Sequence, residues 1–85
     1  MKHIHLIGIG GTGLSAIAKL LKESGYLVSG SDQVISPLAD ALMKMGIQVF
    51  EGHRAENITG ADTIVQSSAV APENPEILAA RAAGI

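Results

Sequence analysis

Two hydrophobic patterns alternate along the chain, and this alternation predicts strands that alternate with helices. Residues Lys2–Ile7 form a near-continuous apolar segment, which is typical of a strand buried on both faces of a sheet. From Thr12 to about Ser24 apolar residues instead recur every three to four positions, which predicts an amphipathic helix. The expected apolar face of this helix consists of Leu14, Ile17, Ala18 and Leu21.

The same alternation continues through the rest of the sequence. Further strands are predicted at Tyr26–Gly30 (ending in Ser31-Asp32), Ile47–Phe50 and Thr63–Gln66, with one helical turn near Ala55–Asn57. Ser36 and Asn74 each precede a proline, which is typical of an N-cap residue followed by proline at the first helical position. These caps open two further predicted helices, the later one covering Ile77–Ala83. The apolar face expected for the earlier one consists of Leu38, Ala41, Leu42 and Met45.

This order of elements predicts an α/β fold with a Rossmann-like, doubly wound parallel sheet. Right-handed crossovers and a switch in winding direction after the third strand give the strand order 3-2-1-4. A ligand crevice is then expected beyond the carboxyl ends of the strands, where the order reverses. The segments that end there are Gly8–Gly13, Gly30–Asp32, Phe50–Arg54 and Gln66–Val70.

A glycine follows each predicted helix and leads toward the next strand. Gly25 and Gly46 precede strands, whereas Gly84 precedes Ile85, the last residue of the sequence. The pattern predicts that the sequence is truncated before a fifth strand, as a fragment of a longer polypeptide. The alternative is a C-terminal tail that frays.

The first predicted strand ends in the glycine spacing G-x-G-x-x-G, on Gly8, Gly10 and Gly13. In such a fingerprint Gly8 allows a sharp turn, Gly10 lets the backbone approach a pyrophosphate, and Gly13 lets the helix pack closely on the strand. The helix N-terminus offers free N–H groups to an anion. Asp32, 24 residues after Gly8, is placed to bind ribose hydroxyls. The alternative is a tight turn with no ligand.

The other segments at this edge also carry candidate ligand-binding residues. Ser31 and Asp32 are candidates for a ribose, although Asp32 could instead cap a turn. His53 could bond a base, a ribose or a phosphate, or face solvent, and Arg54 could be a surface charge. Further candidates are the hydroxyls of Ser67 and Ser68, although these serines could instead only form a turn. Ala69 and Val70 could form an apolar wall against a flat base. His3 and His5 alternate with apolar residues and are expected to be structural.

Composition narrows the functional classes. The 85 residues allow one small domain, and 47% are hydrophobic with two aromatic residues, which predicts an aliphatic core. The net charge of −2 gives no basic surface for nucleic acid, and the lack of cysteine excludes a disulfide framework or thiolate metal site. With no membrane-length apolar run and no signal peptide pattern, we expect a cytoplasmic domain. No catalytic constellation and no P-loop are visible, which favours a domain that holds a diphosphate-bearing ligand.

Several motifs together resemble the N-terminal domain of the bacterial Mur ligases, across essentially all 85 residues. They are the stretches His5–Ser15, Val28–Asp32, Gly52-His53 with Asn57-Ile58, and Ser67–Val70 followed by Asn74-Pro75-Glu76. The match is closest to the members that add L-alanine. The tripeptide-recycling members tend to carry a cysteine in the glycine loop, where this chain has Gly10-Gly11.

The resemblance implies a three-domain ligase of peptidoglycan biosynthesis that acts in cell division and cell shape. Its first domain binds the UDP part of UDP-N-acetylmuramate, its second ATP and Mg²⁺, and its third the amino acid. An acyl phosphate forms on the muramoyl carboxylate, and the amine of L-alanine attacks it. Residues 1–85 would be the first domain, a single UDP-binding unit with no cofactor of its own, inactive without the missing central and C-terminal domains.

The resemblance also assigns roles to residues. It places Gly10, Gly11, Thr12 and Gly13 at the diphosphate, Ser31 and Asp32 beside the uridine ribose, and His53 with Ser67–Val70 near the uracil or sugar. The sequence leaves two other hypotheses open. One is the NAD-binding half of an oxidoreductase or a nucleotide-sensing module, since Asp32 suits an adenosine ribose equally well. The other is a purely structural Rossmann unit used for oligomer contacts.

Overall fold

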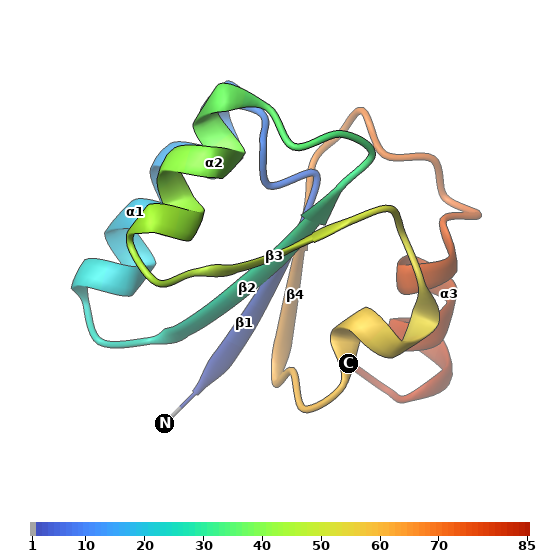
Figure 1. Ribbon diagram of the computed structural model, residues 1–85. Helices are drawn as coiled ribbons and strands as arrows, with labels where there is room; N and C mark the ends of the chain where they lie inside the picture. The colour runs from blue at the N-terminus through green and yellow to red at the C-terminus, as the bar shows by residue number, and fades with distance from the viewer. Residues whose placement is uncertain (1) are drawn as a thin grey trace.

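The computed structural model describes residues 2–85 as an alternation of strands and helices. Figure 1 shows the elements in chain order: β1 (His3–Ile7), α1 (Thr12–Glu23), β2 (Leu27–Asp32), α2 (Pro37–Lys44), β3 (Gln48–Glu51), the 3₁₀ helix η1 (Ala55–Ile58), β4 (Thr63–Gln66) and α3 (Pro75–Ala82). Each predicted strand and helix is present, with ends that differ by about two residues at most, which is the ordinary uncertainty of element boundaries.

The strands form one parallel sheet in the order β3-β2-β1-β4, which confirms the predicted topology. Helices α1 and α2 lie on one face of the sheet, while η1 and α3 lie on the other (Figure 1). In the β1–β2 register His5 pairs with Ser29 and Ile7 pairs with Ser31. Since side chains alternate between faces along a strand, these residues point to the same side of the sheet.

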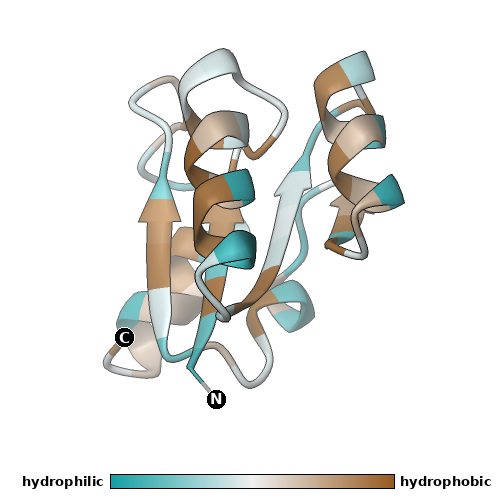
Figure 2. Cartoon of the chain, turned by 90° about the vertical axis from the view of Figure 1, so that its left-hand side faces the viewer, coloured by the Kyte–Doolittle hydropathy of each residue, from teal (hydrophilic) through white to brown (hydrophobic). Residues whose placement is uncertain are grey.

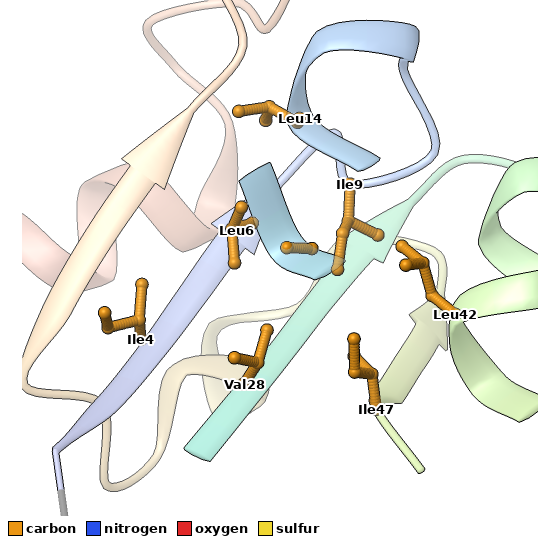
Figure 3. Packing of buried hydrophobic residues seen from close by; sticks show 8 residues of the cluster. Ile4, Leu6, Ile9, Leu14, Val28, Leu42 and Ile47 are labelled. Carbon is orange, nitrogen blue, oxygen red and sulfur yellow. The ribbon is translucent and has the colours of Figure 1, made fainter. Parts of the chain in front are cut away.

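The face under α1 and α2 is closed by an aliphatic core. Figure 3 shows side chains from β1, β2 and both helices converging between the sheet and the helices. The cluster consists of Ile4, Leu6, Ile9, Leu14, Ala18, Val28, Leu42 and Ile47. Leu6, Ile9 and Ala18 are fully buried. Burying a large aliphatic side chain contributes about 1.5–3 kcal/mol, so this layer is a main source of stability.

The apolar faces of the two helices are narrower than predicted. Ile17 and Leu38 are each 43% exposed and Ala41 is exposed, so only part of each predicted apolar face is buried. The residue that brings α2 against the glycine loop is Ala39, whose small side chain permits close approach. Leu38 and Ala41 instead line a groove between α1 and α2. Figure 2, seen from the side of these helices, shows hydrophobic and hydrophilic residues interspersed along them.

The face under η1 and α3 contradicts the expectation of a wholly aliphatic core. Its buried residues include the polar or charged side chains of His5, Ser29, Ser31, Asn57 and Glu76. Ile7, Ile58, Ile77 and Ala80 supply the apolar part of the same layer. These polar side chains can be buried because they are hydrogen-bonded to one another.

Both predicted helix caps are confirmed. The Ser36 hydroxyl accepts a hydrogen bond from the Ala39 N–H at 3.1 Å, and the Asn74 side-chain oxygen accepts one from the Glu76 N–H at 2.9 Å. Within residues 2–85, no helix combines the length and the apolar character needed to cross a bilayer.

Candidate functional site

The turn between β1 and α1 depends on Gly8, as predicted. Gly8 has a φ of +88°, a conformation that glycine adopts at no steric cost. The N–H groups of Gly8 and Ile9 both donate to the Ser31 carbonyl, at 2.8 and 3.0 Å. A Cβ at Gly8 would lie 3.0 Å from Cβ of Ser67. The bare glycine therefore lets the ends of β1 and β4 approach each other.

Gly10 is surrounded by side chains from the end of β2 and from the segment after it. Its N–H donates to Oδ2 of Asp32 at 2.8 Å, and an added Cβ would lie 2.7 Å from the Ser36 hydroxyl oxygen. The other carboxylate oxygen of Asp32 accepts from the Gln33 N–H at 2.8 Å. Asp32 therefore fixes the glycine loop. A carboxylate offers about four acceptor positions, so capacity for ligand hydroxyls remains.

The first turn of α1 presents free backbone donors. Its N-cap, Gly11, contributes no side-chain hydrogen bond, and the first turn contains no acidic residue. The N–H groups of Thr12, Gly13 and Leu14 have no hydrogen-bond partner among residues 2–85. These donors and the helix dipole make this end of α1 suitable for an anion.

The predicted packing role of Gly13 is wrong. Gly13 is exposed, and a Cβ there would meet nothing within 4 Å. Helix α1 packs on the sheet through Leu14 and Ala18, because these residues lie on the buried side of the helix whereas Gly13 faces solvent.

A cleft of about 600 Å³ lies beyond the carboxyl ends of the strands, at the predicted place. It contains six predicted site residues: Gly8, Gly11, Asp32, His53, Ser67 and Ala69. Sequence reasoning did not assign the remaining lining residues Gln33, Ala71, Glu73, Asn74 and Pro75 to the site, whereas Val70 was expected in its wall. Gly10, Thr12, Gly13, Ser31 and Ser68 are not among the lining residues.

The segment after β4 forms a compact turn at the rim of the cleft. The Ser67 hydroxyl accepts from the Ala69 N–H at 3.2 Å, and the Val70 N–H donates to the Ser67 carbonyl at 3.1 Å. This hydroxyl shapes the turn, as the turn-former alternative proposed. Ser68 is exposed outside the cleft, while Ala69 and Val70 give the wall its apolar character.

The cleft floor consists of His53, which lines the cleft, and of the buried Ser31 behind it. Ser31 is fully buried, so its hydroxyl lies beneath the cleft, where it donates to Oε1 of Glu76 at 2.7 Å. Nδ1 of His53 lies 3.0 Å from the Ser31 hydroxyl oxygen and 3.2 Å from Oε2 of Glu76. Ser31 therefore acts on the cleft through neighbouring side chains.

Glu76 is the residue that sequence reasoning missed as a site component. Its carboxylate is fully buried and lies within hydrogen-bond distance of five groups. They are Nε2 of His5 (2.6 Å), the Ser31 hydroxyl (2.7 Å), Nδ2 of Asn57 (2.9 Å), Nδ1 of His53 (3.2 Å) and the Arg54 N–H (3.2 Å). The only signal in the sequence is that Glu76 lies two residues after a predicted helix cap. This position does not predict burial, because the helix dipole also favours exposed acidic residues there.

The surroundings of Glu76 set its ionisation. Burial raises the pKa of its carboxyl. Hydrogen bonds from His5, Asn57 and Ser31, together with the charge interaction with His5, lower this pKa by more than burial raises it. The resulting pKa falls from the ordinary 4.5 to about 2. Glu76 is therefore a buried carboxylate at neutral pH, stabilised by the donors around it.

The hydrogen-bonded cluster continues across β2 to β1. Nδ1 of His5 lies 2.7 Å from the Ser29 hydroxyl oxygen, which also lies 2.7 Å from Nε2 of His3. This confirms the structural role predicted for both histidines. Residues 2–85 contain no group of three His, Cys, Asp or Glu side chains arranged to hold a metal ion.

Comparisons with known proteins by sequence and by structure agree with each other. The family described as "Mur ligase family, catalytic domain" matches residues 3–85. A UDP-N-acetylmuramate–L-alanine ligase from Leptothrix cholodnii is 51% identical over 85 residues, covering 100% of this chain and 18% of the relative. The chain thus spans about a fifth of the length of the curated relatives it matches.

Two crystal structures share the fold over the whole chain. UDP-N-acetylmuramate-alanine ligase from Thermotoga maritima superposes with a TM-score of 0.96 at 36% identity, covering 100% of this chain and 20% of the other. A murein peptide ligase from Psychrobacter arcticus superposes with a TM-score of 0.92 at 29% identity, covering 100% of this chain and 18% of the other.

Proposed function

The chain belongs to the Mur ligase family, and from this premise we propose that it holds the UDP part of UDP-N-acetylmuramate in a ligase that adds L-alanine. In this proposal residues 1–85 are the UDP-binding domain of a three-domain cytoplasmic enzyme of peptidoglycan biosynthesis. Two curated relatives that are 51% and 54% identical are named as alanine-adding ligases. The TM-score of 0.96 to a solved alanine-adding ligase also exceeds the 0.92 and 0.89 to two solved murein peptide ligases, and both observations favour the alanine-adding type.

One observation carries the proposal, namely uncapped helix donors beside a cleft where the strand order reverses. The free N–H groups at the start of α1 suit a diphosphate, and Gly11 lies in the cleft wall next to them. Asp32 borders the same cleft with spare acceptor capacity for ribose hydroxyls. Ala69 and Val70 offer an apolar wall to a flat base. Phosphate, sugar and base thus each find a matching surface.

This chain contributes binding, and we assign it no step of phosphoryl transfer. It lacks the G-x-x-x-x-G-K-[ST] sequence that cradles ATP phosphates, and the described residues 2–85 offer no cluster of three potential metal ligands. In the proposal ATP and Mg²⁺ bind to the central domain of the parent enzyme. The residues described here orient the nucleotide end of the substrate.

The test is a parallel titration of the chain with UDP-N-acetylmuramate, UDP and NAD, followed by amide NMR. We expect the uridine nucleotides to bind more tightly than NAD and to shift the amide signals of Thr12–Leu14 and Asp32. Tighter binding of NAD would instead support the oxidoreductase hypothesis. Absence of binding by all three would contradict the proposal for this chain.

One variant in the glycine loop and one control variant at the far end of α1 test the diphosphate position. Gly11 has a φ of −71°, and its added Cβ would be 3.4 Å from the Gly8 carbonyl oxygen, so alanine fits the fold. Gly11→Ala places a methyl group in the cleft wall and should weaken UDP binding about tenfold or more, equivalent to about 1.4 kcal/mol. Glu23→Ala, at the exposed far end of the same helix, should leave the affinity unchanged. Equal affinities of the two variants in calorimetry would refute this position.

A further inference from the structure

We propose that Glu76 is a positioning residue that fixes the hydrogen of His53 on Nδ1, so that Nε2 offers the cleft a hydrogen-bond acceptor. The ligand group that Nε2 binds is inferred on the basis of the proposed function, whereas the position of the hydrogen on Nδ1 follows from the geometry of the cluster alone. In a neutral imidazole one ring nitrogen is a donor and the other an acceptor, and the partners decide which.

The first step concerns the hydroxyl of Ser31. It lies 2.7 Å from Oε1 of Glu76, and an ionised carboxylate can accept but cannot donate. The single hydrogen of this hydroxyl is therefore directed to Glu76. Toward Nδ1 of His53, 3.0 Å away, the Ser31 oxygen presents a lone pair.

The second step concerns the other oxygen of the carboxylate. Oε2 of Glu76 lies 3.2 Å from Nδ1 of His53 and is also an acceptor. Nδ1 thus faces two acceptors, and a bare ring nitrogen there would repel both. The favourable arrangement places the hydrogen on Nδ1 and leaves Nε2 without one.

The third step locates Nε2. His53 lines the cleft, and its side chain is 13% exposed. Nε2 has no hydrogen-bond partner among residues 2–85, and no buried side-chain nitrogen or oxygen in this part of the chain lacks a partner. Nε2 is therefore accessible, and the accessible edge of this ring borders the cleft.

The same carboxylate also holds the backbone that carries the ring. Oε2 accepts from the N–H of Arg54, the residue after His53, and from Nδ2 of Asn57 at 2.9 Å. Asn57 also donates to the Gly52 carbonyl at 3.2 Å, on the other side of His53. Glu76 therefore sets both the position of the ring and its hydrogen pattern.

This arrangement narrows the ligand group that meets His53. The sequence left a base, a ribose or a phosphate open. An acceptor at Nε2 binds an N–H or O–H donor, such as a base imide or a sugar hydroxyl, and repels the oxygens of an ionised phosphate. We therefore assign His53 to a donor group of the nucleotide sugar, and the diphosphate to the start of α1.

The first test measures the tautomer in the unmodified chain by ring-nitrogen NMR at about pH 8, where an ordinary histidine is neutral. We expect the Nδ1–H form of His53. Titration with UDP should shift the Nε2 signal, whereas pyrophosphate should leave it unchanged. A dominant Nε2–H form would overturn the assignment without any variant, and it would do so whether or not UDP binds.

The second test compares Glu76→Gln with Glu56→Gln, which makes the same chemical change on an exposed residue of η1. The new amide group can take two orientations. If its nitrogen takes the place of Oε2, that nitrogen donates to Nδ1 of His53. If its nitrogen takes the place of Oε1, the Ser31 hydroxyl no longer has an acceptor there and can donate to Nδ1 instead. We expect Glu76→Gln to shift His53 toward the Nε2–H form and to weaken UDP binding about tenfold. Glu56→Gln should change neither.

The two tests separate the possible failures. A folded Glu76→Gln chain with an unchanged tautomer would overturn the role of Glu76. If Glu76→Gln does not fold, the tautomer of the unmodified chain still decides. If the tautomer is as expected but no uridine nucleotide binds, the proposed function fails while the positioning role stands.

Discussion

The two faces of the sheet are built from alternate residues of the same strands, yet they are held together differently. Under α1 and α2, Ile4 pairs with Val28 in a layer of aliphatic side chains. One residue along, His5 pairs with Ser29 in a hydrogen-bonded cluster that ends on Glu76. The first face depends on apolar burial, which has no direction, whereas the second depends on a specific donor for each acceptor.

This difference explains why the cleft floor belongs to the polar face. An aliphatic layer tolerates exchanges of similar volume, so it fixes the elements without fixing any particular polar atom. In the polar layer one carboxylate orients groups from β1, β2, the β3–η1 segment and η1 itself. Both faces therefore stabilise the fold, but only the face under α3 also orients the polar groups of the site.

The largest expected effect comes from breaking the polar face. Glu76→Ala leaves buried donors without an acceptor and should lower the free energy of unfolding by about 3–5 kcal/mol at pH 7, as removal of one partner from a buried charged pair does. Urea denaturation measures this loss. Glu56→Ala, on the exposed surface, should change stability by less than about 0.5 kcal/mol. A loss below about 1 kcal/mol for Glu76→Ala would show that the cluster is not essential to stability.

The apolar face should respond with a similar but slightly smaller loss. Leu6 is fully buried, and Leu6→Ala removes its contacts and leaves a cavity, which costs about 2–5 kcal/mol. Unlike the loss for Glu76→Ala, this loss should be the same at pH 7 and in mild acid. A set of denaturation curves at several pH values would measure both. Equal pH dependence of the two variants would remove the proposed distinction between the faces.

Acid should weaken the polar face alone, by roughly 3 kcal/mol. The folded pKa of Glu76 is about 2, below the ordinary 4.5 expected in the unfolded chain. Its stabilising contribution is therefore complete above the unfolded pKa and is lost as the pH falls toward the folded pKa, at about 1.4 kcal/mol per pKa unit. The stability difference between the wild-type chain and Glu76→Gln should shrink between about pH 4.5 and pH 2. A constant difference would contradict the depressed pKa.

The smallest expected effect uses the two matched helix caps, one on each side of the sheet. Ser36→Ala and Asn74→Ala each remove an N-cap acceptor and should cost about 0.5–2 kcal/mol. The Asn74 cap binds the N–H of Glu76 itself, so only Asn74→Ala should also shift the ring signals of His53. Identical His53 spectra in the two variants would show that the cap does not control the site.

The sequence predicted the fold well because its signals are local. The two caps, the glycines after the helices and the alternation of strand and helix each lie within a few residues, and right-handed crossovers then determine the strand order. The helix faces were less predictable. The rotation of α2 depends on how closely Ala39 approaches the glycine loop, which no periodicity records. The glycine fingerprint likewise predicts close packing at Gly13, which instead faces solvent.

The site was predictable where a backbone motif defines it and not where side chains from distant segments meet. Gly8, Asp32 and Ser67 were found from their positions at strand ends. Glu76 was missed because an acidic residue in a first helical turn is normally exposed, and its burial depends on His5, at the opposite end of the chain. Ser31 was predicted to contact the ligand directly, but it is buried beneath the cleft. Its side-chain direction depends on the sheet register, which the sequence alone does not show.

The bond between His5 and Glu76 also has a consequence for the order of folding, because the two residues are 71 positions apart. Every member of the aliphatic cluster lies between Ile4 and Ile47, so that layer can form before the last helix has docked. The carboxylate gains its donors only when the first strand and the last helix meet, after the largest loop has closed. We therefore expect the aliphatic layer to assemble early and the cleft floor last, so that an ordered His53 marks a chain that has completed its folding.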